Sequence, residues 1–105
     1  MSDFNNQTSQ AGSGVAEDTS VMLPPERKVV FYNDDFTTME FVVEVLIEVF
    51  HKKQAEAEQL MMDVHRKGSA VVGIYPRDIA RTRIAEAVKR ARQQGFPFRL
   101  TMEEV

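Results

Sequence analysis

The sequence predicts one small α/β domain of the α+β type, a two-layer sandwich in which three helices cover one face of a three-stranded, mainly antiparallel sheet. The first observation is the order of strand-like and helix-like segments, which is β-α-α-β-α-β with no internal repeat. The second is size, because 105 residues with 43% hydrophobic content can fill one modest core. The third is the final segment, whose apolar and polar residues alternate as in a sheet open to water on one face.

Residues 1–24 are predicted to be a disordered N-terminal extension of the folded domain, which spans 25–105. The extension is rich in Ser, Gly, Asn, Gln and Thr and has few large apolar residues. Burial therefore cannot offset the entropy that such a segment loses on ordering. Pro24 and Pro25 form a stiff junction between the two parts.

The first strand is predicted over 27–32, where a short β-branched and aromatic run is ended by Asn and Asp. A helix start follows it. Thr37 and Glu40 fit the T-x-x-E capping box, in which each side chain accepts from the other residue's backbone amide. Phe36 and Phe41 fit the hydrophobic staple that accompanies such a box.

The first helix is expected over 38–50, and its only charges form one stripe at a spacing of four. We expect everything outside this stripe to face protein. The stripe consists of Glu40, Glu44 and Glu48. The second helix carries apolar residues at the i, i+3, i+4, i+7 spacing of an amphipathic helix, namely Ala57, Leu60, Met61 and Val64.

Glycine and proline mark the remaining boundaries. Gly68 is expected to stop the second helix, and the continuous apolar run over 70–75 to form the second strand. Pro76 opens the third helix at its first position and Gly95 ends it. The last strand alternates Phe98, Leu100 and Met102 with polar residues, and the third helix is expected to bury Ala80, Ile84, Ala87, Val88 and Ala91.

Composition excludes several classes of function. The net charge is −3, and outside the acidic extension 13 acids (16 − 3) face 13 bases, which is not the basic footprint of a nucleic-acid binder. Without cysteine there is no disulfide, thiolate metal site or cysteine nucleophile. The first twenty residues have no signal-peptide pattern, and no segment has the roughly 18 apolar residues of a membrane span. We expect a cytoplasmic monomer that binds no nucleic acid or membrane.

The stretch Asn33-Asp34-Asp35 is the strongest candidate for a functional site. An Asx turn between strand and helix is the commonest role of such residues. Since Thr37 and Glu40 fill the capping box, however, neither carboxylate has an evident local partner. Free carboxylates beside apolar surface favour a cationic ligand.

His65 lies four residues after Met61, on the same face of the second helix. A lone histidine is more often a satisfied core or rim residue than a ligand group. With Asn33 and Asp34, however, a neutral imidazole supplies a third acceptor, and three acceptors match the three donors of a primary ammonium. The apolar residues nearby are core by default, although methionine also lines pockets for varied side chains: Met39, Val42, Met61 and Val64.

Other chemistries have weaker support. A metal site from Asp34, Asp35, His51 or His65 lacks any recognised ligand spacing, and we expect no metal and no cofactor. A hydrolase lacks a Ser or Cys nucleophile signature and a Gly-rich phosphate loop. The bases of the third helix read as a solvated face, with an acidic protein partner as the functional alternative and RNA as a weaker one: Arg77, Arg81, Arg83, Lys89, Arg90 and Arg92.

Taken together, these residues resemble the ClpS adaptors, which select substrates for the Clp ATP-dependent protease. The resemblance covers about residues 25–105. It is carried by Y-N-D-D-F-T-T-M-E-F-V at 32–42, M-M-D-V-H-R-K-G at 61–68, V-V-G-I-Y at 71–75 and A-x-T-x-I-A at 80–85.

The resemblance implies a non-enzymatic adaptor that binds N-degrons, meaning free protein N-termini that begin with Phe, Tyr, Trp or Leu, and delivers them to a Clp AAA+ unfoldase while modulating its substrate choice. Asn33, Asp34 and His65 would bind the α-amino group, with Thr37 near the peptide backbone and Asp35 in the same binding site. The side-chain pocket would be lined by Met39, Val42, Met61, Val64 and Phe98, of which Met39 is implied to gate against β-branched side chains.

The resemblance also implies a docking site for a partner and two departures from the family pattern. Asp78 and Arg83 fall where the family docks on the N-terminal domain of a ClpA-type unfoldase, and the N-terminal extension would assist delivery. Thr38 stands where many members have proline, which is expected to loosen the turn. Phe98 stands where leucine is common, which is expected to narrow the pocket.

Overall fold

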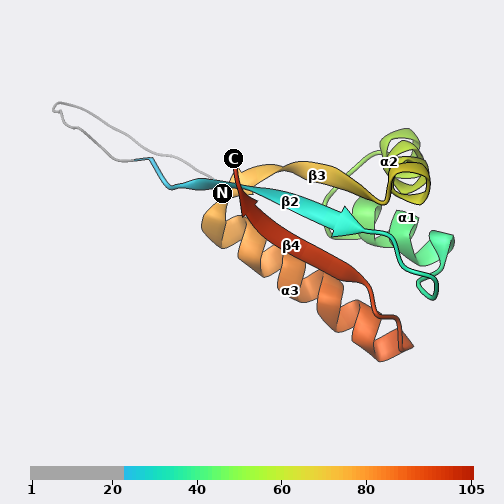
Figure 1. The fold of residues 1–105 in the computed structure, drawn as a ribbon. Coiled ribbons are helices and arrows are strands. Elements are labelled where there is room, and N and C mark those ends of the chain that lie inside the picture. The colour runs from blue at the N-terminus through green and yellow to red at the C-terminus, as the bar shows by residue number, and fades with distance from the viewer. Residues whose placement is uncertain (1–22) are drawn as a thin grey trace, which may run out of the picture.

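The computed structural model describes residues 23–105, so the predicted extension over 1–24 lies almost entirely outside the described residues. The element order is the predicted β-α-α-β-α-β (Figure 1). Its members are β2 (Glu26–Tyr32), α1 (Met39–Glu48), α2 (Gln54–Lys67), β3 (Ser69–Pro76), α3 (Arg77–Gln94) and β4 (Arg99–Glu104).

The three strands form one sheet in the order β3-β2-β4, and both pairings are antiparallel. The predicted antiparallel sheet is thus confirmed. Residues that pair across β2 and β4 lie on the same face of the sheet. Phe31 and its partner Leu100 lie on the core side, and Tyr32 and its partner Arg99 lie on the outer side. On that outer side the Arg99 guanidinium lies 4.3 Å from the centre of the Tyr32 ring.

The helices divide the covered face of the sheet between them. Figure 1 shows α3 lying along the sheet, while α1 and α2 gather at the end where β2 finishes and β3 begins. Helix α3 contacts all three strands, whereas α2 packs on α1 and on β3. The α1–α2 pair therefore stands beside the loop that follows β2, where the candidate residues are concentrated.

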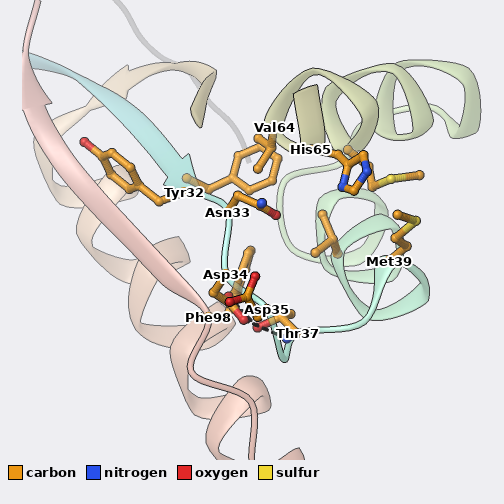
Figure 2. Close-up of a pocket in the computed structure, with 12 residues that line it drawn as sticks. Tyr32, Asn33, Asp34, Asp35, Thr37, Met39, Val64, His65 and Phe98 are labelled. Atoms are coloured by element: carbon orange, nitrogen blue, oxygen red, sulfur yellow. Dashed lines mark hydrogen bonds between the residues drawn. The ribbon is translucent and has the colours of Figure 1, made fainter. Parts of the chain in front are cut away.

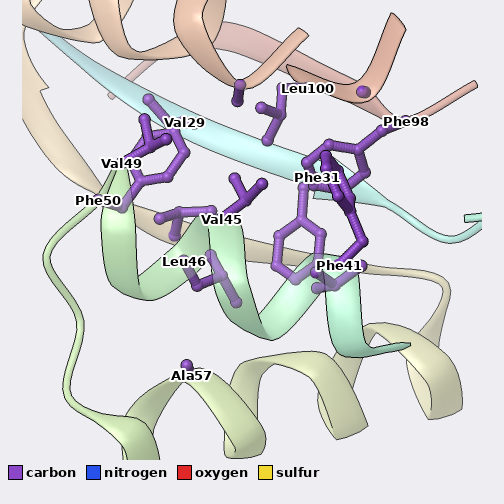
Figure 3. Packing of buried hydrophobic residues seen from close by; sticks show 14 of the residues in the cluster. Val29, Phe31, Phe41, Val45, Leu46, Val49, Phe50, Ala57, Phe98 and Leu100 are labelled. Atoms are coloured by element: carbon purple, nitrogen blue, oxygen red, sulfur yellow. The ribbon is translucent and has the colours of Figure 1, made fainter. Parts of the chain in front are cut away.

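The core is built around the middle of α1 and β2 (Figure 3). Val29, Phe31, Val45 and Leu46 are fully buried. Phe98 joins this core through edge-on contacts, with its ring centre 5.9 Å from that of Phe31. Burying each such large apolar side chain contributes about 1.5–3 kcal/mol. The aromatic part of the core lies at the same end of the sheet as the candidate site.

The predicted start of α1 is wrong by one residue. Thr38 is the N-cap, and its hydroxyl accepts a 3.1 Å hydrogen bond from the amide of Phe41. Thr37 and Glu40 therefore form no capping box. The predicted staple is also wrong, because the Phe36 side chain is 73% exposed.

The other helix boundaries follow the predicted glycines and proline, with one shift at Pro76. Gly68 and Gly95 end their helices in left-handed conformation, with φ of +93° and +76°, as predicted. Pro76 is the N-cap of α3 and not its first helical residue. The expectation that α1 is covered everywhere outside its glutamates is wrong, because Val43 and Ile47 are only half-buried.

Candidate functional site

A cavity of about 260 Å³ opens where β2 ends, between that strand's following loop, α1 and α2 (Figure 2). This volume is below the roughly 300–1,000 Å³ of sites for drug-sized ligands, so it suits a single amino-acid side chain. All ten residues expected to bind a ligand line it, namely Asn33, Asp34, Asp35, Thr37, Met39, Val42, Met61, Val64, His65 and Phe98.

Hydrogen bonds of the backbone bring the two halves of this site together. The amide of Asn33 donates to the carbonyl oxygen of Gly68 at 2.9 Å. The amide of Gly68 in turn donates to the carbonyl oxygen of Val64 at 2.8 Å. The loop after β2 is thereby fixed to the last turn of α2, which carries Val64 and His65.

The floor of the cavity is apolar and belongs to the core. Val42, Val64 and Phe98 are 9%, 4% and 6% exposed. The Phe98 ring is held edge-on by Phe41, with the ring centres 5.7 Å apart. A side chain that entered the cavity would therefore meet a preformed apolar surface.

The rim of the cavity is formed by residues that reach water. Met39 is 47% exposed and Met61 is half-buried, so two flexible thioether side chains border the opening. Asn33 and His65 are exposed, and Figure 2 shows them on the loop and on α2 at the same hollow. Amide and imidazole acceptors thus line the same cavity as the apolar floor.

The expectation that both carboxylates lack a local partner is wrong for Asp34. Its Oδ1 accepts from the amides of Phe36 at 2.8 Å and Thr37 at 2.7 Å, and its Oδ2 accepts from the Thr37 hydroxyl at 2.7 Å. The Asx turn weighed above is therefore present. A carboxylate has about four acceptor positions, so one position and the full negative charge stay available to a ligand.

These hydrogen bonds also set the charge of Asp34. Partial burial pushes the pKa of its carboxyl upward, but the hydrogen bonds from Thr37 and Phe36 favour the ionised form more strongly. The net pKa lies below the usual value of 3.8. Asp34 is consequently an anion at neutral pH and adds a negative potential to the rim of the cavity.

Two lining residues were missed by the sequence reasoning. Phe31 and Tyr32, the last residues of β2, also line the cavity. A signal was available, because these residues directly precede Asn33 and any strand that delivers that loop must end beside it. The strand alternation places Phe31 on the core side, where it supports the floor.

The residues expected to dock a partner lie at the other end of the sheet. Asp78 is in the first turn of α3, with its side chain 88% exposed and 3.8 Å from Arg81. Arg83 is only half exposed, because its Nη1 donates to the carbonyl oxygen of Val49 at 2.9 Å. Arg83 thus ties α3 to the end of α1 and is not a free surface cation.

The distance between the two surfaces follows from the β2–β3 pairing. Tyr32 pairs with Ser69 at the cavity end, and Glu26 pairs with Pro76 at the end that leads into α3. A strand rises about 3.3 Å per residue, so the six steps of β2 correspond to a separation of roughly 20 Å. A ligand in the cavity leaves the surface around Asp78 uncovered.

Residues 23–105 offer no support for the alternative metal chemistry. Nowhere in this part of the chain do three His, Asp or Glu side chains gather as a metal ion would require. None of the helices between residues 23 and 105 is both long enough and apolar enough to cross a membrane.

Comparisons with known proteins agree with one another. The family model described as "ATP-dependent Clp protease adaptor protein ClpS" matches residues 22–101. The ATP-dependent Clp protease adapter protein ClpS of Acetivibrio thermocellus is 55% identical over 80 residues, which cover 76% of this chain and 81% of that protein. The protein of the same name from Nautilia profundicola is 46% identical over 91 residues, covering 87% and 94%.

A solved structure is similar as well. Agrobacterium tumefaciens ClpS2 bound to L-phenylalaninamide matches with a TM-score of 0.74 and 43% sequence identity. The match covers 77% of this chain and 98% of that one.

Proposed function

Because this chain belongs to the ClpS family of adaptor proteins for the ATP-dependent Clp protease, we propose that it binds N-degrons and hands them to a Clp unfoldase. The observation that carries the proposal is the joining of two surfaces in one cavity. An apolar floor that suits one side chain lies directly below a rim of acceptors. A free N-terminus that begins with a large apolar residue carries an apolar side chain and an ammonium group on the same carbon atom. The side chain matches the floor and the ammonium group matches the acceptors of the rim.

The rim suits an α-ammonium group. Asn33 and His65 offer acceptors from two elements, and ionised Asp34 supplies negative charge with one acceptor position left. Three acceptors match the three donors of an ammonium group. The structural relative from A. tumefaciens is bound to L-phenylalaninamide, which carries a free amino group beside a phenyl ring, and this supports the assignment.

The floor suits Phe, Tyr, Trp or Leu. Burying one such side chain contributes about 1.5–3 kcal/mol, and each charge-assisted hydrogen bond adds about 1.5–3 kcal/mol. Association costs about 4–15 kcal/mol. This cost offsets much of the gain, so tight binding is not expected. We propose an affinity near the micromolar range, about −8 kcal/mol, which suits a substrate that must be released to the next component. Met39 is half-exposed at the opening, and this position supports a role in excluding side chains that branch next to the backbone.

Delivery requires a second surface that stays free when the cavity is filled. We assign that surface to the start of α3 around Asp78, roughly 20 Å from the cavity by the strand rise, with the N-terminal domain of a ClpA-type unfoldase as its partner. On this assignment Asp78 contacts the partner, and Arg83 holds α3 in place through Val49.

Reconstituted degradation tests this proposal. A fluorescent protein that begins with Phe and one that begins with Met would each be incubated with the unfoldase, its peptidase and ATP, with and without this protein. We expect this protein to accelerate the loss of fluorescence for the Phe reporter alone. Equal acceleration of both reporters, or of neither, would contradict an N-degron adaptor.

A further inference from the structure

A second hollow of about 680 Å³ lies beside the cavity, between α1 and α2. Met39 and Met61 line both hollows, so the two are continuous across these side chains. We call this second hollow the α1–α2 groove. Val43 and Ile47 of α1 line it and are only half-buried, so its floor is apolar and accessible.

The walls of the groove are acidic. Glu40, Glu44, Glu48 and Glu58 line it, and no lysine or arginine is among its lining residues. Glu48 forms an ion pair with Arg90 and is thereby partly neutralised. Glu40, Glu44 and Glu58 carry the rest of the negative charge, and two of them, Glu40 and Glu44, lie on the stretch of α1 that begins at the cavity.

We propose that the α1–α2 groove binds the residues that follow the N-terminal residue of the substrate, and that it favours basic side chains among them. This inference rests on the proposed function. A peptide whose first side chain fills the cavity must leave it over the rim, and Met39 and Met61 are the part of the rim that opens into the groove. The occupant is therefore the continuation of the same peptide.

The dimensions of the groove suit a short extended segment. Its α1 wall runs from Met39 to Glu48, nine helical steps, which corresponds to about 13.5 Å at 1.5 Å per residue. An extended chain rises about 3.3 Å per residue, so about four residues match this length. These would be residues 2 to about 5 of the substrate.

The mixed lining explains why lysine and arginine are favoured. Their aliphatic stems can cover apolar surface such as Val43 and Ile47 while the charged heads stay in water. On α1 those heads would lie beside Glu40 and Glu44, which lie three residues before and one residue after Val43. Aspartate and glutamate at the same substrate positions would meet like charge.

Fluorescence anisotropy with three ligands tests the inference: a labelled peptide beginning Phe-Lys-Val-Lys, one beginning Phe-Glu-Val-Glu, and phenylalaninamide as a competitor without following residues. We expect the lysine peptide to bind the wild type about fivefold more tightly than the glutamate peptide at low salt, since several weak exposed pairs contribute. In the Glu40→Gln/Glu44→Gln double variant the ratio should fall below about twofold.

The matched control is Glu26→Gln/Glu104→Gln, which removes the same charge from exposed positions of β2 and β4 outside the groove. This control variant should keep the wild-type ratio of the two peptide affinities. The affinity for phenylalaninamide should agree within about twofold among the wild type and both double variants. If phenylalaninamide binds but the two peptides bind the wild type with equal affinity, the groove assignment is overturned. The same conclusion follows if the affinity ratio of the two peptides falls equally in both double variants. Failure of all three ligands to bind overturns the proposed function and the groove with it.

Discussion

The backbone amide of Asn33 donates a 2.9 Å hydrogen bond to the carbonyl oxygen of Gly68. This bond joins residues that are far apart in the chain, the loop after β2 and the end of α2. The loop supplies the carboxylate and amide of the rim, and α2 supplies His65 and part of the floor. The shape of the cavity therefore depends on how α2 ends.

Gly68→Ala should lower both stability and ligand affinity. At φ of +93° an alanine is strained even though no atom lies within 4 Å of its added Cβ, and the penalty is about 1 kcal/mol. Relief of that strain would shift the carbonyl that holds Asn33. Chemical unfolding and peptide anisotropy measure the two effects.

Gly95→Ala is the matched control for that variant. Its φ is +76°, and again nothing lies within 4 Å of the added Cβ, but Gly95 ends α3 and does not line the cavity. We expect a similar loss of stability with unchanged affinity. If both variants keep wild-type affinity, the Asn33–Gly68 bond does not shape the cavity.

Asp34 should make the stability of the protein sensitive to acid. Its folded pKa lies below the usual 3.8, so the stabilisation is complete above about pH 4 and is lost as the pH falls through the lower folded value. Urea unfolding of the wild type and Asp34→Asn between pH 2 and 7 measures this. The wild type should be the more stable protein at pH 7, and the difference should shrink below pH 4; a difference that does not vary with pH would refute the assignment.

Phe98→Leu should change which N-terminal residue is preferred. The Phe98 ring is part of the cavity floor, and Phe98→Leu removes three carbon atoms from that floor, whereas even one methylene in a pocket is worth roughly 1–3 kcal/mol. We expect the affinity ratio between Phe and Leu peptides to shift about fivefold or more. The loss of stability should be about 2 kcal/mol, at about 0.8 kcal/mol for each buried carbon removed. Phe96→Leu is the control, because Phe96 contacts Phe41 at 5.1 Å between ring centres but does not line the cavity. An equal shift in both variants would show that Phe98 does not act through the floor.

Asp78→Ala and Arg83→Ala should separate docking from folding. The Asp78 side chain is 88% exposed, so its removal should change stability by less than about 0.5 kcal/mol while it weakens binding to the unfoldase. Arg83→Ala removes the donor to Val49 and the contact with Tyr75 at 5.5 Å, which should cost about 1–3 kcal/mol of stability. Calorimetry and titration with the unfoldase's N-terminal domain check both. An Arg83→Ala variant of wild-type stability would contradict the structural role.

The element order was predictable because each segment carries its own periodicity and its own boundary signal. The run ending at Tyr32, the glycines at 68 and 95 and the alternation after Phe98 are local features, and local features persist in the folded chain. Asn33, Asp34 and His65 could also be singled out from the residues alone, because they lie beside these boundaries, whereas Phe98 was assigned to the pocket only through the family resemblance.

Two features could not be predicted. The choice of helix cap depends on competition between neighbouring side chains, and the partner of Arg83 lies far away in the sequence. Thr37 and Thr38 are both good caps, and Thr37 loses that role because Asp34, three residues earlier, takes its amide and hydroxyl. Arg83 reads as a surface base, yet its partner is the Val49 carbonyl 34 residues away. No periodicity reports a contact of that kind.

Recognition of a free N-terminus by this cavity is the central claim, and its most direct test is an anisotropy titration with two peptides that differ only in one acetyl group. The account predicts micromolar binding of the peptide with a free N-terminal Phe. It predicts at least about tenfold weaker binding of the acetyl-Phe peptide, which has lost the cation and its charge-assisted hydrogen bonds. Equal affinity for the two peptides would show that Asn33, Asp34 and His65 do not hold an ammonium group.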